Sequence, residues 1–379
     1  MVSLQSGSAP PTAGGESPVG VIVLQLGTPE STDVRDVRRY LREFLSDPRV
    51  IDIPAPLRAL LLNAVILPFR PRRSAEQYEK IWTDEGSPLL LNTELLARSL
   101  QEDLGAGYVV EVGMRYQSPS IASALSRLAG AGCHRVVIAP MFPQYSSAAY
   151  GSAVAKTLEL VASGWNVPAT STIPPFYDDP GFVSSVTEVA GPLLADFEPD
   201  HILFSYHGLP ESQIRKGDPT GEWCLQSEGC CDSIQAVNRF CYRAQSCATT
   251  KSVTSDMGLD PGATSTSFQS RLAGQKWIEP YTDALLDDLY RDGVRRLAVL
   301  TPSFVADCLE TLEEIGIRLR DQWSAIGGED LLLVPCVNGA PGWVSALADL
   351  VRVEARNLSD GDEETIGGER ADADSLAAN

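Results

Sequence analysis

The sequence predicts an α/β protein with two lobes, each built on a parallel sheet that helices cover on both faces. Short runs rich in Val, Ile and Leu alternate along the chain with stretches of helical periodicity. The strand-like runs are continuously apolar, as in parallel strands buried on both faces. The chain has 379 residues, of which 44% are hydrophobic, and this is enough for two domains with cores of their own.

The first lobe is expected over residues 18–180, in a Rossmann-like arrangement. Its apolar strands are predicted at residues 21–24, 108–112 and 135–138, with helices at 34–45 and 120–128. An apolar stretch at residues 57–69 is interpreted as a buried helix. The alternative is a lip that touches a membrane, which would give the protein a peripheral membrane contact.

The second lobe is expected over residues 181–340 and begins with a joining helix at 182–197. Apolar strands are predicted at residues 202–204, 297–300 and 331–334, with a helix at 282–291. A cysteine-rich insertion occupies residues 221–247. Residues 341–357 should form a closing helix.

Both ends of the chain are predicted to be disordered. Residues 1–17 are rich in Ser, Gly and Pro, and residues 358–379 form an acidic tail without aromatic residues. The N-terminus has no basic start followed by an apolar run, so we expect no secretory signal and a cytoplasmic protein. The net charge of −20 argues against a nucleic-acid partner, because a duplex binder needs a basic face.

Two strand ends of the second lobe carry the residues with the clearest chemistry. His207, one of three histidines, follows the strand at 202–204, and residues 301–314 follow the strand at 297–300. Parallel sheets place their sites at the carboxyl ends of strands, so both segments should reach one crevice. Glu310 and Glu314 are four residues apart and would share a helix face. An imidazole facing two carboxylates could bind a divalent metal and move protons.

Simpler interpretations of these residues exist. His207 could be a core or capping histidine. Glu310 and Glu314 could belong to a solvated helix face, and Glu313 and Arg318 nearby fit that interpretation as well.

Five of the eight cysteines fall close together in the insertion, and they are Cys224, Cys230, Cys231, Cys241 and Cys247. In a cytosolic chain such a group is more often metal-binding than disulfide-bonded. The absence of a Cys-x-x-Cys pair weakens a zinc-ribbon interpretation, whereas four thiolates would suit a [2Fe-2S] cluster. The remaining cysteines, at 133, 308 and 336, are expected to be buried thiols.

Several segments, in their order along the chain, resemble the motifs of ferrochelatases. In the second lobe these are residues 204–210 (Phe-Ser-Tyr-His-Gly-Leu-Pro), 217–219 (Gly-Asp-Pro), 267–271 (Ser-Phe-Gln-Ser-Arg), 276–283 (Lys-Trp-Ile-Glu-Pro-Tyr-Thr-Asp) and 304–315 (Phe-Val-Ala-Asp-Cys-Leu-Glu-Thr-Leu-Glu-Glu-Ile). In the first lobe they are residues 24–30 (Leu-Gln-Leu-Gly-Thr-Pro-Glu), 44–50 (Phe-Leu-Ser-Asp-Pro-Arg-Val), 86–88 (Gly-Ser-Pro), 113–116 (Gly-Met-Arg-Tyr) and 142–146 (Phe-Pro-Gln-Tyr-Ser). The resemblance covers roughly residues 19–355, and it is to the protoporphyrin-using bacterial type.

The resemblance implies an enzyme that inserts Fe2+ into protoporphyrin IX and releases two protons, the last step of haem synthesis. The fold it implies is the chelatase fold, two flavodoxin-like lobes with the macrocycle in the cleft between them. His207 matches the family's active-site histidine and Glu310 its metal-site carboxylate, so both are candidate ligands of the substrate Fe2+. Glu314 could relay protons or guide the hydrated ion. The sequence does not decide on which side the metal enters.

The resemblance also implies which residues contact the porphyrin. The matching positions are Leu26, Arg115, Tyr116, Ser118 and Trp277. They would supply aromatic and aliphatic walls, and cations or hydroxyls for the propionates. Phe142 stands where relatives often have tyrosine.

Many members of this family carry a [2Fe-2S] cluster, often with three ligands near the C-terminus and one just after the Pro-Gln-Tyr-Ser motif. Here that last position is Ser147, and the tail has no cysteine. An internal cluster on four of the five grouped cysteines is therefore preferred over zinc or free thiols. Cys247 is the least expected ligand, and Cys230 and Cys231 could exchange roles.

Three alternative functions deserve comparison with the sequence. A coproporphyrin III ferrochelatase is the strongest alternative, because the enzyme distinguishes porphyrins of different side-chain charge through lip residues that the sequence alone does not identify. A sirohydrochlorin chelatase would lack Trp277 and the Gln269-Ser-Arg271 motif. A non-catalytic iron-sulfur sensor on a chelatase scaffold would have lost His207 or Glu310, and both are present.

Overall fold

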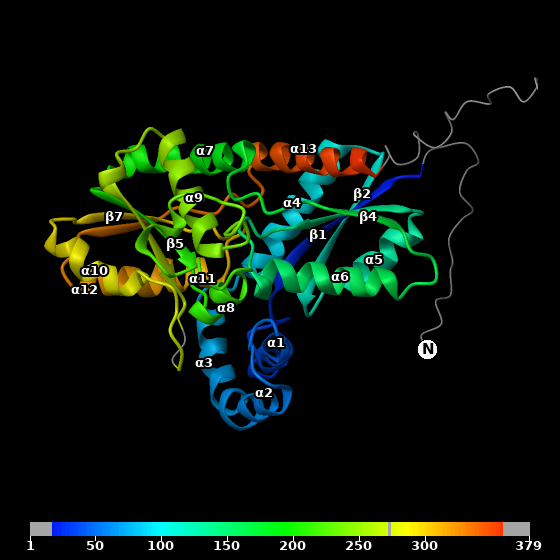
Figure 1. Cartoon of the computed structure of the whole chain (residues 1–379), viewed down its shortest axis with the longest axis horizontal. Coiled ribbons are helices and arrows are strands. Elements are labelled where there is room, and N and C mark those ends of the chain that lie inside the picture. Colours follow the sequence, from blue (N-terminus) through cyan, green and yellow to red (C-terminus); the bar gives the residue numbers. More distant parts are fainter. Residues whose placement is uncertain (1–16, 272–273, 359–379) are drawn as a thin grey trace, which may run out of the picture.

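The computed structural model describes residues 17–271 and 274–358 (Figure 1). The predicted disordered ends lie outside these residues, apart from Ser17 and Leu358. The described chain forms two four-stranded sheets with strand orders β2-β1-β3-β4 and β6-β5-β7-β8, and neighbouring strands are parallel throughout. The predicted α/β class with parallel sheets is confirmed.

The first sheet is covered by helices on both faces. Its strands are β1 (Val19–Gly27), β2 (Tyr108–Tyr116), β3 (Arg135–Pro140) and β4 (Ala169–Thr172). Side chains of β1 alternate between two cores, because successive residues of a strand point to opposite faces. Val21 and Val23 pack with α4 (Pro88–Leu104) and α13 (Pro341–Asn357). Ile22 and Leu24 pack with α5 (Ile121–Gly130) and α6 (Ser152–Ala162), which follows the π-turn η2 (Ser147–Gly151).

The second sheet repeats this plan. Its strands are β5 (His201–His207), β6 (Thr264–Gln269), β7 (Arg296–Leu300) and β8 (Asp330–Leu333). One face packs on α7 (Pro180–Phe197) and α9 (Tyr242–Asp256), and the other on α10 (Thr282–Arg291) and α12 (Arg320–Ala325). The shorter elements are α8 (Glu211–Lys216), η3 (Glu228–Cys231), η4 (Pro261–Ala263), α11 (Leu309–Leu312) and the π-helix η5 (Glu314–Leu319).

Both sheets place the first strand of their lobe beside the third, with the second strand on its outer side. The chain therefore winds outward in opposite directions from β1 and β3, and again from β5 and β7. Such a switch in strand order leaves a crevice at the carboxyl ends of the two central strands, where ligands bind in α/β sheets.

The sequence does not predict strands β4 and β6. Their sequences, Ala-Thr-Ser-Thr and Thr-Ser-Thr-Ser-Phe-Gln, are polar and show no apolar run. Both are edge strands, where one side of the ladder is unpaired and hydroxyl side chains are tolerated. Hydrophobicity marks the central strands and the apolar edge strands β2 and β8, and misses the two polar edges.

A helical lip, residues 34–79, projects from the first lobe below the two sheets (Figure 1). It consists of α1 (Val34–Ser46), α2 (Ala55–Leu61), the π-turn η1 (Leu62–Ile66) and α3 (Leu67–Glu79). The interpretation of residues 57–69 as a buried helix is wrong, because Leu57, Leu60, Val65 and Phe69 are 56%, 64%, 55% and 75% exposed. Because the lip projects from the lobe, there is too little protein surface next to it to bury all sides of its helices.

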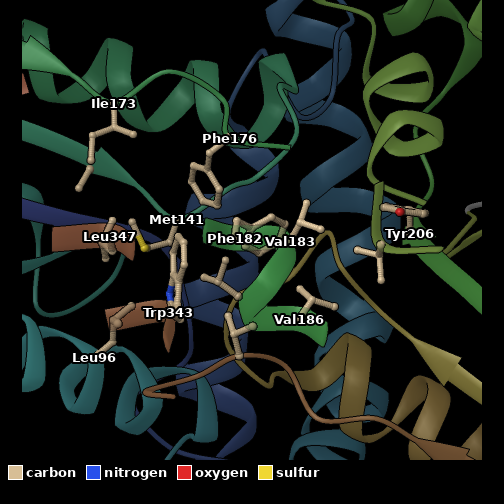
Figure 2. Packing of buried hydrophobic residues seen from close by; sticks show 14 of the residues in the cluster. Leu96, Met141, Ile173, Phe176, Phe182, Val183, Val186, Tyr206, Trp343 and Leu347 are labelled. Atoms are coloured by element: carbon tan, nitrogen blue, oxygen red, sulfur yellow. The ribbon is translucent and has the colours of Figure 1, made fainter. Parts of the chain in front are cut away.

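The two lobes share one core. Phe176, Phe182 and Trp343 pack around one another with ring centroids 5.2 to 5.5 Å apart. Figure 2 shows them in one cluster with Ile173, which directly follows β4, and Tyr206 of β5. Helix α13 returns to the first lobe and packs on α4 and α7. Because this core includes β1 and β5 alike, it fixes the crevices of the two sheets relative to each other. Among residues 17–271 and 274–358, no helix is both long and apolar enough to span a bilayer.

Candidate active site

A large cavity opens between the carboxyl ends of the two sheets. It encloses about 930 Å3, and ligand pockets typically measure about 300–1,000 Å3. Its walls come from the segments that follow β1, β3, β5 and β7 and from the lip helices α1 and α3. His207, Glu310 and Glu314 all line it. The three residues predicted from two strand ends therefore do meet in one crevice.

His207 ends β5 and is half-buried. Its backbone N–H donates to Ser303 Oγ at 3.1 Å, and its Nδ1 lies 2.7 Å from the carbonyl oxygen of Gly208. A carbonyl oxygen can only accept, so Nδ1 carries the proton and Nε2 of the neutral ring keeps its lone pair. The ring packs beside Trp277 and Phe304. His207 thus has one nitrogen fixed by the backbone and one nitrogen free to accept a proton.

The two glutamates do not lie on one continuous α-helix. Glu310 belongs to the single turn α11, whereas Glu314 begins the π-helix η5. Cys308 caps α11, because its thiol accepts from the backbone N–H of Thr311 while the Thr311 hydroxyl accepts from the Cys308 N–H at 3.0 Å. The predicted shared α-helical face is therefore interrupted, although both carboxylates reach the same cavity.

Ser270 holds Glu314 with two hydrogen bonds. Its N–H donates to Oε1 at 2.9 Å and its hydroxyl to Oε2 at 2.6 Å. Ser270 has a φ of 67°, in the left-handed region that non-glycine residues seldom occupy. Burial raises the pKa of Glu314 above its ordinary value, and the charge of Glu310 adds to the rise. The Ser270 hydrogen bonds and the positive charge of Arg318 lower the pKa again, as does His207 when its ring is protonated.

Three lip residues lie near Glu310, and none of them was predicted as a site residue. The Tyr40 and Tyr78 phenols are buried and hydrogen-bonded to each other, and burial raises the pKa of both well above the usual range. Burial lowers the pKa of Arg70, and the negative charge of Glu310 opposes the drop. The lip and α11 are far apart in the sequence, so no sequence pattern predicts that these three residues lie near Glu310.

Glu313 is not part of a solvated helix face. It is 2% exposed. Its carboxylate pairs with Lys80 of α3 at 3.1 Å and with Arg318 at 3.2 Å. This buried carboxylate ties the lip to the second lobe, directly beside Glu310 and Glu314.

The five positions expected to contact porphyrin do not all reach the cavity. Leu26, at the end of β1, and Trp277 line it, and so does Phe142. The Arg115 guanidinium instead binds Asp47 at 2.6 Å, and the Tyr116 hydroxyl donates to the same carboxylate at 2.9 Å. Ser118 is exposed and is absent from the cavity wall.

Buried polar atoms without a partner line the cavity. In the part of the chain that the structure describes, these include Trp277 Nε1, Gln144 Oε1 and Gln213 Oε1. A buried donor or acceptor left unpaired costs about 1–3 kcal/mol. Such atoms are therefore natural contact points for a bound molecule.

Four of the five grouped cysteines are buried, with their thiols together. Cys224, Cys230, Cys231 and Cys241 are each at most 6% exposed. The sulfurs of Cys230 and Cys231 are 3.6 Å apart, and the Cys241 thiol is hydrogen-bonded to both Cys224 and Cys231. Cys247 is half-buried and lies on α9. In residues 17–271 and 274–358, no three His, Cys, Asp or Glu side chains surround a point that could hold one metal ion.

Asp218, in the predicted Gly-Asp-Pro motif, organises the entry to the cysteine segment. Its carboxylate accepts from the backbone N–H groups of Thr220, Trp223 and Cys224 at 2.8 to 2.9 Å. The Cys224 N–H and the other donors hold the pKa of Asp218 well below its usual range. The first cysteine of the group is thereby fixed by the backbone. The predicted buried thiols Cys133, Cys308 and Cys336 are confirmed at 5%, 5% and 8% exposure.

Known proteins resemble this chain in sequence and in fold. The family model described as Ferrochelatase matches residues 18–355. A ferrochelatase of Coxiella burnetii (strain Dugway 5J108-111) is 44% identical over 334 residues, which is 88% of this chain and 93% of the relative. One of Legionella pneumophila (strain Paris) is 45% identical over 332 residues, 88% of this chain and 98% of the relative. The solved structure of SirB from Bacillus subtilis with Fe3+ shares the fold, with a TM-score of 0.53 at 11% identity, covering 91% of this chain and 98% of SirB.

Proposed function

The chain belongs to the ferrochelatase family, enzymes that insert Fe2+ into a porphyrin in the last step of haem synthesis, and we propose that its own reaction takes place on protoporphyrin IX in the cavity between the two sheets. The observation that carries this proposal is the free Nε2 of His207 in the same cavity as Glu310 and Glu314. The reaction replaces two pyrrole N–H protons by one Fe2+, so the site needs proton acceptors and oxygen ligands for the incoming ion.

The site residues would divide this work as follows. Nε2 of His207 accepts a pyrrole proton, because Nδ1 is committed to the Gly208 carbonyl. Glu310 binds the incoming Fe2+ through carboxylate oxygen, a ligand that suits a labile divalent ion. Glu314, held by Ser270, passes protons onward or guides the hydrated ion.

The walls fit a flat, largely apolar macrocycle. Leu26, Phe142 and Trp277 supply apolar surface, and the unpartnered Trp277 Nε1–H can donate to a polar substituent. For Arg115 and Tyr116 we propose an indirect role, in which they hold Asp47 at the end of α1 and so position the lip.

A steady-state assay with Fe2+ and two porphyrins tests the substrate. We expect turnover with protoporphyrin IX and a kcat/KM at least tenfold lower with coproporphyrin III, whose two additional carboxylates would enter an apolar wall. Preference for coproporphyrin III would replace the substrate assignment and leave the reaction intact. Absence of metal insertion with either porphyrin would overturn the function.

We also propose that Cys224, Cys230, Cys231 and Cys241 hold a [2Fe-2S] cluster, with Cys247 outside the ligand set. Their thiols contact one another in a chain from Cys224 through Cys241 and Cys231 to Cys230. A chain of contacts spans two metal ions better than one, since a single ion needs its ligands around one point. When bound, the cluster would cross-link a segment of little regular structure.

The cluster proposal is tested by purifying the protein without oxygen. We expect two iron and two acid-labile sulfide per chain and visible charge-transfer absorption, all lost in Cys224→Ser and kept in Cys247→Ser. Zinc without sulfide, or free thiols alone, would refute it.

The exposed apolar lip supports a peripheral membrane contact at the cavity mouth. Leu57, Leu60, Val65 and Phe69 are exposed, and Arg72 and Arg73 follow on the same helix as Phe69. Apolar side chains beside cations suit an anionic bilayer surface. We expect co-sedimentation with anionic phosphatidylglycerol vesicles that Leu60→Asp with Phe69→Asp weakens, whereas equal binding of both proteins would refute the contact.

A further inference from the structure

The cysteine segment ends inside the wall of the active-site cavity. Cys241 is the last of the four buried cysteines, and Tyr242 directly after it begins α9. Tyr242 is 6% exposed and lines the cavity. A residue of the cysteine group and a residue whose side chain lines the site are therefore neighbours in the chain.

Tyr242 is connected to His207 by two hydrogen bonds. Its phenol is hydrogen-bonded to the side chains of Ser303, in the loop after β7, and of Ser246, one turn further along α9. The same Ser303 hydroxyl oxygen accepts the backbone N–H of His207 at 3.1 Å. These bonds cross between the ends of β5 and β7, whose ladder stops at Phe204 and Leu300, whereas on the other side His207 is still paired with Gln269 of β6. They therefore support the backbone of the histidine on its β7 side, where it has no strand neighbour.

The beginning of α9 also supports the wall contributed by the first lobe. Gln245 Oε1 accepts the backbone N–H of Tyr145 at 2.6 Å. Gln144 donates through Nε2 to Thr249 Oγ1 at 2.9 Å, and Gln144 itself lines the cavity. A displacement of the first turns of α9 would therefore disturb both walls of the site.

We propose that Tyr242 is a positioning residue for His207, acting through Ser303, and that it couples the cysteine group at Cys241 to the active site. The inference rests on the proposed function, since it assigns a regulator to that same site. A group bound by the cysteines fixes the backbone of residues 241 and 242, and this fixes the phenol, the Ser303 hydroxyl and the end of β5. Loss of the bound group would release the backbone of residues 241 and 242, and with it the phenol, the Ser303 hydroxyl and the end of β5.

Removing only the phenol hydroxyl distinguishes a positioning role of Tyr242 from a role in which its ring simply fills the cavity wall. Tyr242→Phe keeps the ring but breaks the hydrogen bond to Ser303. We expect kcat for Fe2+ insertion to fall about three- to tenfold, as for the loss of one hydrogen bond, with the porphyrin KM and the Kd from fluorescence quenching unchanged. Ser303→Ala should act alike, and the double variant should be no worse than either single one.

Tyr206→Phe is the matched control. Tyr206 is the neighbour of His207 on β5, is fully buried and bonds Thr250 through its hydroxyl at 2.9 Å, away from the cavity. We expect it to leave kcat unchanged. Because the chain has three histidines, selective labelling resolves the His207 ring signal by NMR. That signal should move in Tyr242→Phe and stay in Tyr206→Phe. Normal kcat and an unmoved signal in Tyr242→Phe, with an active wild type, would overturn the inference and leave the proposed function standing.

The coupling to the cysteines has its own test. Cys241→Ser should lower kcat in the wild-type background and have little further effect in Tyr242→Phe, because the path is already broken there. The His207 signal should shift in the same direction in both single variants. Effects on kcat that multiply in the double variant, or an unmoved His207 signal in Cys241→Ser, would show that the cysteines and His207 are not coupled through Tyr242.

Discussion

At the scale of single residues, the sequence predicts the chemical groups of the site but not what sets their properties. His207, Glu310 and Glu314 are found where strand ends and motifs place them. The tautomer of His207 depends on the Gly208 carbonyl, and the charge of Glu314 on Ser270. Arg115 and Tyr116 turn toward Asp47, a partner that only the folded lip brings within reach. Apart from the adjacent Gly208, these partners lie far away along the chain, so no local pattern reports the pairings.

Ser270→Ala should move the acid side of the pH–rate profile to higher pH. Burial has already raised the pKa of Glu314, and the Ser270 hydroxyl counteracts this by favouring the ionised carboxylate. Without that bond the pKa rises further, so Glu314 loses its charge at a higher pH and activity falls earlier on acidification. The control is Ser265→Ala at the other end of β6, whose hydroxyl pairs with His201. An acid limb that stays in place or moves downward would contradict the role of Ser270.

Lys80→Met should lower stability, because it leaves the buried Glu313 carboxylate with Arg318 as its remaining ion-pair partner. Lys80 is half exposed, so we expect a loss of about 1 kcal/mol in the free energy of unfolding rather than that of a fully buried pair. Urea denaturation measures this loss. Lys156→Met, which removes a surface pair with Glu159, should change it by less than about 0.5 kcal/mol. Equal effects of the two substitutions would contradict a structural role for Glu313.

At the scale of elements, periodicity predicts the apolar strands and the helices α1, α5, α7, α10 and α13, but not α4, α6 or α9, and the remainder depends on context. Strands β4 and β6 are polar edges that pair with a sheet already formed. The break between α11 and the π-helix η5 has no signal in the spacing of Glu310 and Glu314. Residues 57–69 have the composition of a buried helix, yet their position on a projecting lip exposes them. Composition predicts a helix here, and the fold decides what that helix touches.

Asp218→Asn should weaken the proposed cluster by freeing the loop that carries Cys224. The charged carboxylate accepts three backbone N–H groups, including that of Cys224, and an amide accepts them less strongly. We expect iron and sulfide per chain to fall, with faster loss of visible absorption in the presence of a chelator. Asp260→Asn, which removes a similar charge from the turn at η4, is the control. Unchanged iron and sulfide in Asp218→Asn would contradict this account of the loop.

At the scale of the whole molecule, two lobes with the same strand order are held by one core. The alternation of strands and helices predicts the two sheets. It does not predict that α13 returns to the first lobe or that Trp343 packs against both Phe176 and Phe182. The shared core matters for function, because the cavity exists only if both sets of strand ends keep their relative position.

Trp343→Ala should destabilise both lobes together. Removing a fully buried tryptophan costs about 3–5 kcal/mol, and Trp343 contacts rings that join the two sheets. We expect a lower urea midpoint and one transition whether unfolding is followed by circular dichroism or by fluorescence. Two separate transitions, with one lobe unaffected, would contradict a core common to both lobes.

The most direct test of the central claim compares the wild type with His207→Ala in Fe2+ insertion and in porphyrin binding. In the proposed reaction His207 accepts a pyrrole proton, a step needed for metal entry but not for docking of the macrocycle. We expect insertion of Fe2+ into protoporphyrin IX to fall at least a hundredfold, within the range of about 10²–10⁴ for a lost general base, while the Kd for the porphyrin changes less than threefold. Normal turnover in His207→Ala would contradict the assignment of this cavity as the site of metal insertion.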